Sequence, residues 1–307
     1  MKKILLSTFF AFHLLLGYSQ GCSDAGFCTL NTIKAQGLDL DGMETHRHQV
    51  TFGISYGSGQ NDVNVTVPYA EYIYRIKDYL DLGAKLTYSF NNGELGNVSG
   101  FGDLFLSSNY RINGDSKVVN SFTLGFKIPL SDGNKMSQGS SLPMVYQPSL
   151  GTFDLIAGYN IAIRHLGIGV AYQQPLTNPN DNQFSPADFP DPRAGDYLAT
   201  RSLTRKADVL LRVSYSIPLL ENKLNIRPGL LPIYHLGNDL FLDENDMEQE
   251  IEGSQGLTLN GNIFVDYNIN ETNTIALNWG RPFISRDAFP DGLLRRFVVG
   301  VDYKVRF

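Results

Sequence analysis

The chain has 307 residues, enough for one large domain or two modest ones. It carries 25 basic and 31 acidic residues, a formal net charge of −6, and no basic cluster, which argues against nucleic acid as a partner. Charged residues make up 18% of the chain, below the roughly 25% of soluble proteins, whereas aromatic residues reach 12%. The composition therefore argues against a nucleic-acid-binding protein and is unusual for a soluble one.

The N-terminus has the three-part plan of a secretory signal peptide. Two lysines precede an apolar run, and small and polar residues follow from Gly17. The run is too short for a comfortable spanning helix, so we expect residues 1–20 to be removed on export, with cleavage near Gln20. Lipidation of Cys22 is the alternative.

Residues 21–46 separate the signal peptide from the first predicted strand. They contain the two cysteines of the chain, Cys22 and Cys28, for which an exported protein predicts a small-loop disulfide. Metal binding is the alternative use of the soft ligands in this region, although Cys-x5-Cys is not a zinc-knuckle spacing. Those ligands are Cys22, Cys28, Met43, His46 and His48. The segment is predicted either to plug the following domain or to form a periplasmic tail.

Alternation of apolar and polar residues divides the remaining chain into about twelve candidate strands. Each is close to the 9–11 residues that a tilted membrane-spanning strand needs. In chain order they are 48–57, 65–76, 79–90, 101–112, 118–130, 151–163, 166–176, 206–219, 222–235, 256–269, 272–284 and 297–307.

The two faces of these strands decide the fold class. In 206–219, Val209, Leu211 and Val213 alternate with Asp208 and Arg212. One face is too polar for the core of a soluble sandwich, and the other is too apolar for water. An all-β transmembrane antiparallel barrel satisfies both faces, with lipid outside and a polar lumen inside. We therefore predict that residues 47–307 form such a barrel in contact with outer-membrane lipid. A soluble sandwich is the alternative.

The connections between strands alternate in length. Those near 77–78, 113–117, 164–167, 219–223 and 269–273 are short, whereas 91–100, 131–150, 177–200 and 237–255 are long and polar. Short periplasmic turns and long extracellular loops are typical of outer-membrane barrels. The last strand ends in Phe307 and resembles the terminal signal by which the barrel-assembly machinery of Gram-negative bacteria recognises its substrates.

A family resemblance lies in the middle third of the chain. Its residues are Gly102-Asp103-Leu104, Gly125-Phe126-Lys127-Ile128-Pro129, Asp132-Gly133 and Gly151-Thr152-Phe153-Asp154. They resemble a family of outer-membrane transporters encoded beside the meta-cleavage pathway of phenol degradation, distantly similar to the long-chain fatty-acid channels. The resemblance implies a 12-stranded channel for small, often apolar solutes. The segment after the signal peptide is similar to exported proteins of the Bacteroidetes group.

Ten charged residues fall on the parity that faces the lumen, and they are candidates for a selectivity lining. They are Lys85, Asp103, Arg111, Lys127, Asp154, Asp208, Arg212, Asp266, Asp302 and Lys304. The alternative is a paired network that fills a small barrel, and both descriptions can hold together. Because the charges are mixed and the loops acidic, the sequence argues against a strongly anion-selective pore. Apolar residues on the same parity would give an apolar solute places to bind: Phe105, Ile156, Leu210 and Phe264.

An enzymatic barrel is the competing class. The histidine expected at the rim is His235, with Asp239 and Asp243 nearby, but no serine follows it in the order of the barrel phospholipases. The acidic residues 243–252 could bind a divalent cation or form a solvated loop. We predict no catalytic residue, cofactor or metal, and a passive uptake channel for small apolar or aromatic solutes. A closed docking barrel and a barrel hydrolase are the alternatives, and the oligomeric state is left open.

Overall fold

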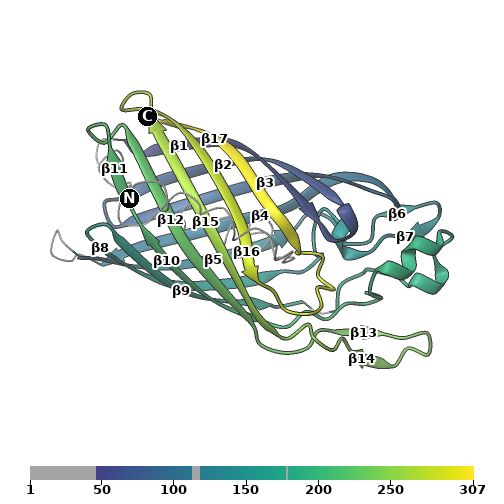
Figure 1. Ribbon diagram of the computed structural model, residues 1–307. Helices are drawn as coiled ribbons and strands as arrows, with labels where there is room; N and C mark the ends of the chain where they lie inside the picture. The colour runs from purple at the N-terminus through teal and green to yellow at the C-terminus, as the bar shows by residue number, and fades with distance from the viewer. Residues whose placement is uncertain (1–45, 113–117, 178) are drawn as a thin grey trace, which may run out of the picture.

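The computed structural model describes residues 46–112, 118–177 and 179–307, and these form one antiparallel sheet that closes on itself (Figure 1). Neighbouring strands follow the order β10-β9-β8-β5-β4-β3-β2-β1-β17-β16-β15-β12-β11, and pairing of β10 with β12 completes the circle. The strands of the wall are β1 (His48–Gly59), β2 (Asn64–Lys77), β3 (Leu80–Gly93), β4 (Gly96–Ile112), β5 (Val118–Pro129), β8 (Asp154–Ile163), β9 (Leu166–Pro175), β10 (Asp208–Tyr215), β11 (Ile217–Leu219), β12 (Leu224–His235), β15 (Gly256–Asn268), β16 (Asn273–Ile284) and β17 (Arg295–Arg306).

The predicted 12-stranded barrel is confirmed, because β10 and β11 are two parts of one strand. Both pair with β12, and they are separated at Ser216, whose backbone N–H donates to the carbonyl of His165. The sequence predicted an unbroken strand over 206–219. No helix in the described ranges is long and apolar enough to cross a membrane.

Side chains alternate across the wall as the sequence pattern predicts. On β17, Val301 and Tyr303 are 45% and 43% exposed, whereas the neighbouring Asp302 and Lys304 are 4% and 7% exposed. The same alternation of exposed apolar and buried polar side chains recurs on the other strands. The exposed apolar surface faces outward, where lipid would cover it, and the charged side chains face the interior.

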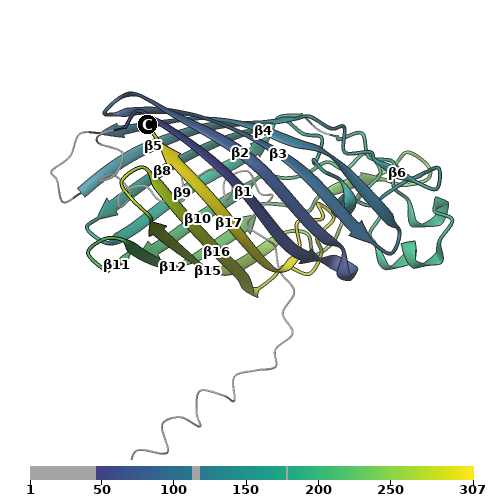
Figure 2. The ribbon, with the colours of Figure 1, turned by 90° about the horizontal axis from the view of Figure 1, so that it is seen from above.

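The two ends of the barrel differ. At one end, called here the turn end, the strands are joined by residues 78–79, 164–165, 220–223 and 269–272. The turn predicted at 113–117 lies outside the described residues. At the other end, called the loop end, long connections run over residues 130–153, 176–207, 236–255 and 285–294. These loops contain β6 (Met136–Ser137), β7 (Ser140–Ser141), η2 (Met144–Tyr146), η3 (Pro186–Asp188), η4 (Pro192–Asp196), β13 (Leu240–Leu242) and β14 (Glu248–Glu250), which gather beyond the wall in Figures 1 and 2.

One predicted loop is instead an extended hairpin. Residues 91–100 were expected to be a long polar loop, but β3 and β4 continue pairing as far as Gly93 and Gly96. The Asn and Gly residues that suggested a loop are compatible with strands that project beyond the membrane. The tip is held by Leu95, which is fully buried and whose backbone N–H donates to the Tyr146 hydroxyl at 3.1 Å. A shorter connection, which contains η1 (Gln60–Asp62), joins β1 to β2.

Two buried apolar clusters lie at the loop end. The mouth cluster joins inward-facing strand residues to loop residues, and consists of Phe105, Met144, Leu150, Ile156, Ala171, Leu203, Leu210, Leu231, Ile233, Ile251 and Leu293. The lobe cluster lies around the β3–β4 tip, and consists of Val63, Val65, Val67, Leu95, Leu142, Val145, Tyr146, Phe184, Phe189, Ala194 and Tyr197. The loops are therefore a folded layer with its own core, not the polar coverings that the sequence suggested.

The orientation of the side chains leads to a stability prediction. Leu277 lies near the middle of β16 and is 48% exposed on the outer face, so Leu277→Arg should cost about 2–4 kcal/mol of folding free energy in a bilayer. Leu220→Arg is the matched control, because Leu220 is 65% exposed in the turn after β11, where the cost falls to about 0–1 kcal/mol. Urea titration of folding into vesicles measures both. Equal costs would show that the outer face is wrongly assigned.

Candidate functional site at the mouth of the barrel

A ring of polar contacts joins the wall to the loops at the loop end. Lys127 on β5 and Asp154 on β8 form a buried ion pair, with 2.9 Å between Nζ and Oδ2. Lys127 Nζ also donates to Thr152 Oγ1 at 3.1 Å, and Gln173 Nε2 of β9 donates to the same oxygen of Asp154 at 2.5 Å. On the neighbouring β4, Asp103 accepts a hydrogen bond of 2.6 Å from Ser149 of the β5–β8 loop. The side chains at these strand ends are therefore held by the loops as well as by each other.

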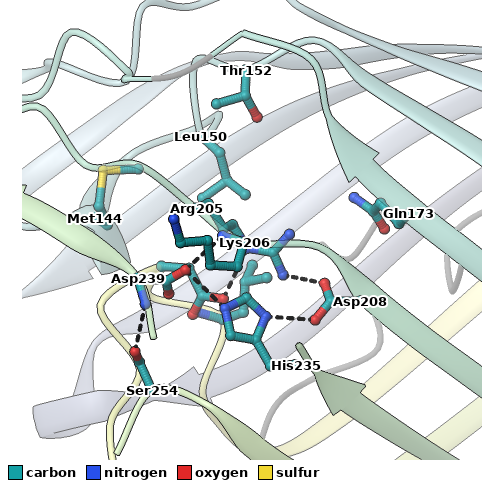
Figure 3. A network of polar contacts seen from close by, with 12 residues as sticks. Met144, Leu150, Thr152, Gln173, Arg205, Lys206, Asp208, His235, Asp239 and Ser254 are labelled. Atoms are coloured by element: carbon teal, nitrogen blue, oxygen red, sulfur yellow. Dashed lines mark hydrogen bonds and ion pairs between the residues drawn. The ribbon is translucent and has the colours of Figure 1, made fainter. Parts of the chain in front are cut away.

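Arg205 connects the wall to two loops (Figure 3). It belongs to the β9–β10 loop; its Nη2 contacts Asp208 Oδ2 on β10 at 2.5 Å, and its Nε contacts Asp291 Oδ2 in the β16–β17 loop at 3.1 Å. Arg286 of that loop also contacts Asp291, at 2.6 Å. All four side chains are buried, so each charge depends on these partners.

The pKa values of the two loop residues follow from these contacts. Burial alone would raise the pKa of the Asp291 carboxyl, but Arg286 and Arg205 outweigh burial and hold that pKa well below its ordinary value. Burial alone would lower the pKa of the Arg205 guanidinium, but Asp208 and Asp291 raise it above its ordinary value. Both groups therefore stay charged while the loops are docked.

His235, at the end of β12, lies between two carboxylates. Its Nδ1 is 2.7 Å from Asp208 Oδ1, and its Nε2 is 2.8 Å from Asp239 Oδ1 in the following loop (Figure 3). Where both carboxylates are ionised, each accepts a hydrogen bond and each ring nitrogen donates one. The nearby Ser254 donates its hydroxyl hydrogen to the Ile251 carbonyl and accepts from the Asp239 backbone. His235 therefore has no nitrogen left to deprotonate a hydroxyl.

The two acids near His235 in the sequence have different partners. Asp239 contacts His235, but the Asp243 carboxylate accepts from the backbone of Asn245 and Met247 at the turn of the β13–β14 hairpin. The three residues considered for the alternative of an enzymatic barrel therefore do not come together as one group. The acidic residues that follow Asp243 lie on this hairpin and are mostly exposed.

The loops close the mouth by packing on apolar side chains of the wall. Phe105, Ile156, Leu210, Leu231 and Ile233 face inward from four strands, and all are almost fully buried. Loop residues of the mouth cluster cover them: Met144, Leu150, Leu203, Ile251 and Leu293. Beside them a pocket of about 30 Å³, large enough for a water molecule or two, lies between Phe105, Asp103 and Leu293. Phe264, expected in the same lining, is only half-buried.

Most of the other candidate residues lie nearer the turn end, in further sets of buried contacts. Asp81 lies between Arg75 at 3.0 Å and Arg111 at 2.8 Å. Asp266 accepts from Lys304 at 2.9 Å and from Arg227.

A tyrosine connects two further candidates. The Tyr69 hydroxyl donates to Asp302 at 2.5 Å, and Lys85 Nζ lies 3.6 Å from the centroid of the Tyr69 ring. Arg212 is buried on β10, two residues from Leu210 of the mouth cluster. The ten candidates are therefore divided between the mouth and the part of the wall nearer the turn end.

Several members of these networks were missed from the sequence. Glu71, Arg75, Asp81, Arg227 and Arg306 are buried on the inward parity of their strands, so the alternation could have identified them. Arg205, Arg286 and Asp291 lie in loops, where no periodic pattern marks the side that a residue faces.

Most of the N-terminal residues considered for a metal site lie outside the described residues, as do the signal peptide and the cysteine pair. Of the two histidines that are described, His48 is held by aromatic neighbours: its Nδ1 lies 2.7 Å from the Tyr72 hydroxyl, and its ring stacks on Tyr74 and Phe307. Within the described ranges, no group of three or more His, Cys, Asp or Glu side chains could hold a metal ion.

The contacts of Arg205 lead to a prediction for the loops. Arg205→Met leaves Asp208 and Asp291 buried without their shared partner, so we expect the docked loops to lose about 3–5 kcal/mol of stability. Limited proteolysis of the protein in vesicles should then cleave residues 179–207 much faster, while the wall remains intact. Arg193→Met is the control, because its pairs with Asp191 and Glu94 are exposed and should matter little. Unchanged cleavage in Arg205→Met would contradict the role given to this residue.

Comparison with known proteins agrees with the architecture. An outer membrane channel from Pseudomonas putida F1 has a similar structure, with a TM-score of 0.59 at 14% identity over 85% of this chain and 96% of that one. The KdgM porin gives a TM-score of 0.44 at 8% identity over 84% and 99% of the two chains. Phospholipase A of the Escherichia coli outer membrane gives 0.40 at 11% identity over 87% and 96%. No family model matches the sequence, and no curated protein matches it either. The chain therefore has the fold of the outer-membrane β-barrel channels of Gram-negative bacteria.

Proposed function

We propose that this protein is an outer-membrane channel for the passive uptake of small apolar or aromatic solutes, and that its own loops close the mouth between passages. The observation that carries the proposal is the apolar lining of the mouth. The interior of an outer-membrane channel is ordinarily polar. Here Phe105, Ile156, Leu210, Leu231 and Ile233 face inward at the entrance.

Those wall residues would contact a solute when the loops move away. In the closed state they pack on Leu150, Leu203 and Leu293 of three different loops. An apolar solute can replace these contacts at little cost, because it offers the wall the same kind of surface. A strongly hydrated sugar cannot do so without losing water. The site therefore favours apolar and aromatic solutes over polar nutrients of the same size.

The resemblance to transporters encoded beside phenol degradation agrees with this substrate class, and the structure that gives the TM-score of 0.59 is an outer membrane channel. Aromatic compounds of that kind, taken up by a member of the Bacteroidetes, are the most specific form of the proposal. The proposal also includes export by a signal peptide over residues 1–20 and recognition of Phe307 by the assembly machinery. It includes a Cys22–Cys28 disulfide and a plug formed by residues 21–46 as well. No sequence motif for energy coupling follows the signal peptide, so transport would be passive.

A closed docking barrel is the competing function, and the filled mouth is the observation that favours it. The lobe cluster would then support a working surface outside the membrane. A hydrolase is less compatible with the site, because both nitrogens of His235 are bonded to carboxylates.

Uptake into liposomes separates the channel from the docking barrel. The purified protein should speed entry of benzenesulfonamide, a neutral aromatic solute, over protein-free liposomes and over its own effect on glucose. Arg205→Met should raise the rate further, because it weakens the closed mouth, and removal of the plug, residues 21–46, should do the same. Arg193→Met should behave as the wild type. If none of these proteins admits the solute, the channel proposal fails and the docking barrel replaces it.

A further inference from the structure

The buried charges of the barrel are distributed unevenly along its axis. Each strand can be divided at its midpoint into a half near the loops and a half near the short turns, with β10 and β11 taken as the one strand that they form. The inward-facing residues of the halves near the short turns are called here the turn half. The inward-facing residues of the halves near the loops, together with the buried loop residues, are called the mouth half. The bounds of the strands place every buried charge of the wall in one or the other.

The turn half is positively charged. Among the described residues it contains six basic side chains: Arg75, Lys85, Arg111, Arg227, Lys304 and Arg306. It contains four carboxylates, Glu71, Asp81, Asp266 and Asp302. All are buried except Arg111, whose side chain is 12% exposed. Positive charges therefore exceed negative ones by two.

The hydrogen bonds show the same excess locally. Asp81 is shared by Arg75 and Arg111, and Asp266 is shared by Arg227 and Lys304. Each of these carboxylates thus faces two cations. The ammonium group of Lys85 lies over the Tyr69 ring, whose hydroxyl donates to Asp302. An excess of buried positive charge is costly unless water or an anion compensates it.

The mouth half, in contrast, is closer to balance. Its buried cations are Lys127, Arg205, Arg212, Arg286 and Arg295, and its carboxylates are Asp103, Asp154, Asp208, Asp239 and Asp291. His235 contacts two of these carboxylates. A solute that leaves the apolar mouth therefore meets the larger excess of positive charge in the turn half.

The acidic β13–β14 hairpin does not cancel this arrangement. Its carboxylates, from Asp243 to Glu252, are mostly exposed, and the hairpin projects beyond the wall to one side in Figure 1. Exposed charges are screened over about 8 Å at physiological ionic strength, whereas charges inside a narrow lumen with low-dielectric walls are screened much less.

We infer that the channel selects small organic anions, compounds with an apolar or aromatic body and a carboxylate or sulfonate group. This inference rests on the proposed function and names its substrate class. The mouth cluster accommodates the apolar body, and the basic turn half attracts the anionic group toward the periplasmic end. The sequence argued against strong anion selectivity because its ten candidates are five acids and five bases and its loops are acidic. In the barrel, however, three of the five acids lie in the mouth half and three of the five bases lie in the turn half.

Three aromatic solutes of similar size test the inference in liposomes. Benzenesulfonate is permanently anionic, benzenesulfonamide is neutral and phenyltrimethylammonium is permanently cationic, and both ions cross lipid slowly. We expect the wild type to admit benzenesulfonate fastest and phenyltrimethylammonium slowest. Equal rates for all three, or a preference for the neutral or cationic solute, would overturn the inference and leave the channel proposal intact. Failure of all three to enter would overturn both.

Two substitutions connect the selectivity to the turn half. Lys85→Gln and Arg227→Gln each remove one of its positive charges, and each should lower the ratio of benzenesulfonate to benzenesulfonamide uptake by about threefold or more. Lys223→Gln is the matched control, because it removes the same charge from an exposed turn at the same end. Heat-modifiable migration on gels confirms folding of each variant. An unchanged ratio in folded Lys85→Gln and Arg227→Gln would remove the turn half as the source of selectivity.

Discussion

The pairing of β10 with β12 is the contact on which the rest of the structure depends, because it turns a sheet into a barrel. Closure gives every strand an inside and an outside. Outward side chains such as Leu277 and Val301 can then face only lipid, and inward polar groups can find partners only in the barrel, in the loops or in water. The shared carboxylates Asp81 and Asp266 follow from this constraint, since an isolated buried charge would be very costly.

The same constraint explains why the loops fold inward. Asp208, at the loop end of β10, is paired with Arg205. Arg205 belongs to one loop and also contacts Asp291 of another loop. Leu210 and Ile156 likewise complete their packing with loop side chains. The wall near the mouth is thus an incomplete core, and the loops supply the missing half. Closure of the mouth is a result of folding, not an addition to a finished channel.

The alternation of side chains was enough to predict the fold, but not the partners. Twelve strands and the inward parity of the ten candidates could be predicted because both depend on a period of two, which is visible in a single strand. The hairpin at 91–100 was missed because Asn and Gly are common in loops and equally compatible with strands that leave the membrane. The contact of Arg205 with Asp291 spans 86 residues between two loops, where periodicity carries no information. Asp239 is four residues from His235 and could be noticed from the sequence, but the contact of His235 with Asp208 on the neighbouring strand required the register.

The kinds of contact at the mouth and in the wall differ in what it costs to break them. Opening the loops would separate Arg205 from Asp208 and Asp291, but water entering the mouth would hydrate all three groups and repay part of the lost attraction. Opening the wall would expose backbone N–H and C=O groups to lipid, where nothing can replace their hydrogen bonds. Loops held by ion pairs and apolar contacts can therefore move while the ladder of the barrel stays closed. A mouth that is filled in the folded state is for this reason compatible with a channel, provided that the moving parts are the ones in contact with water.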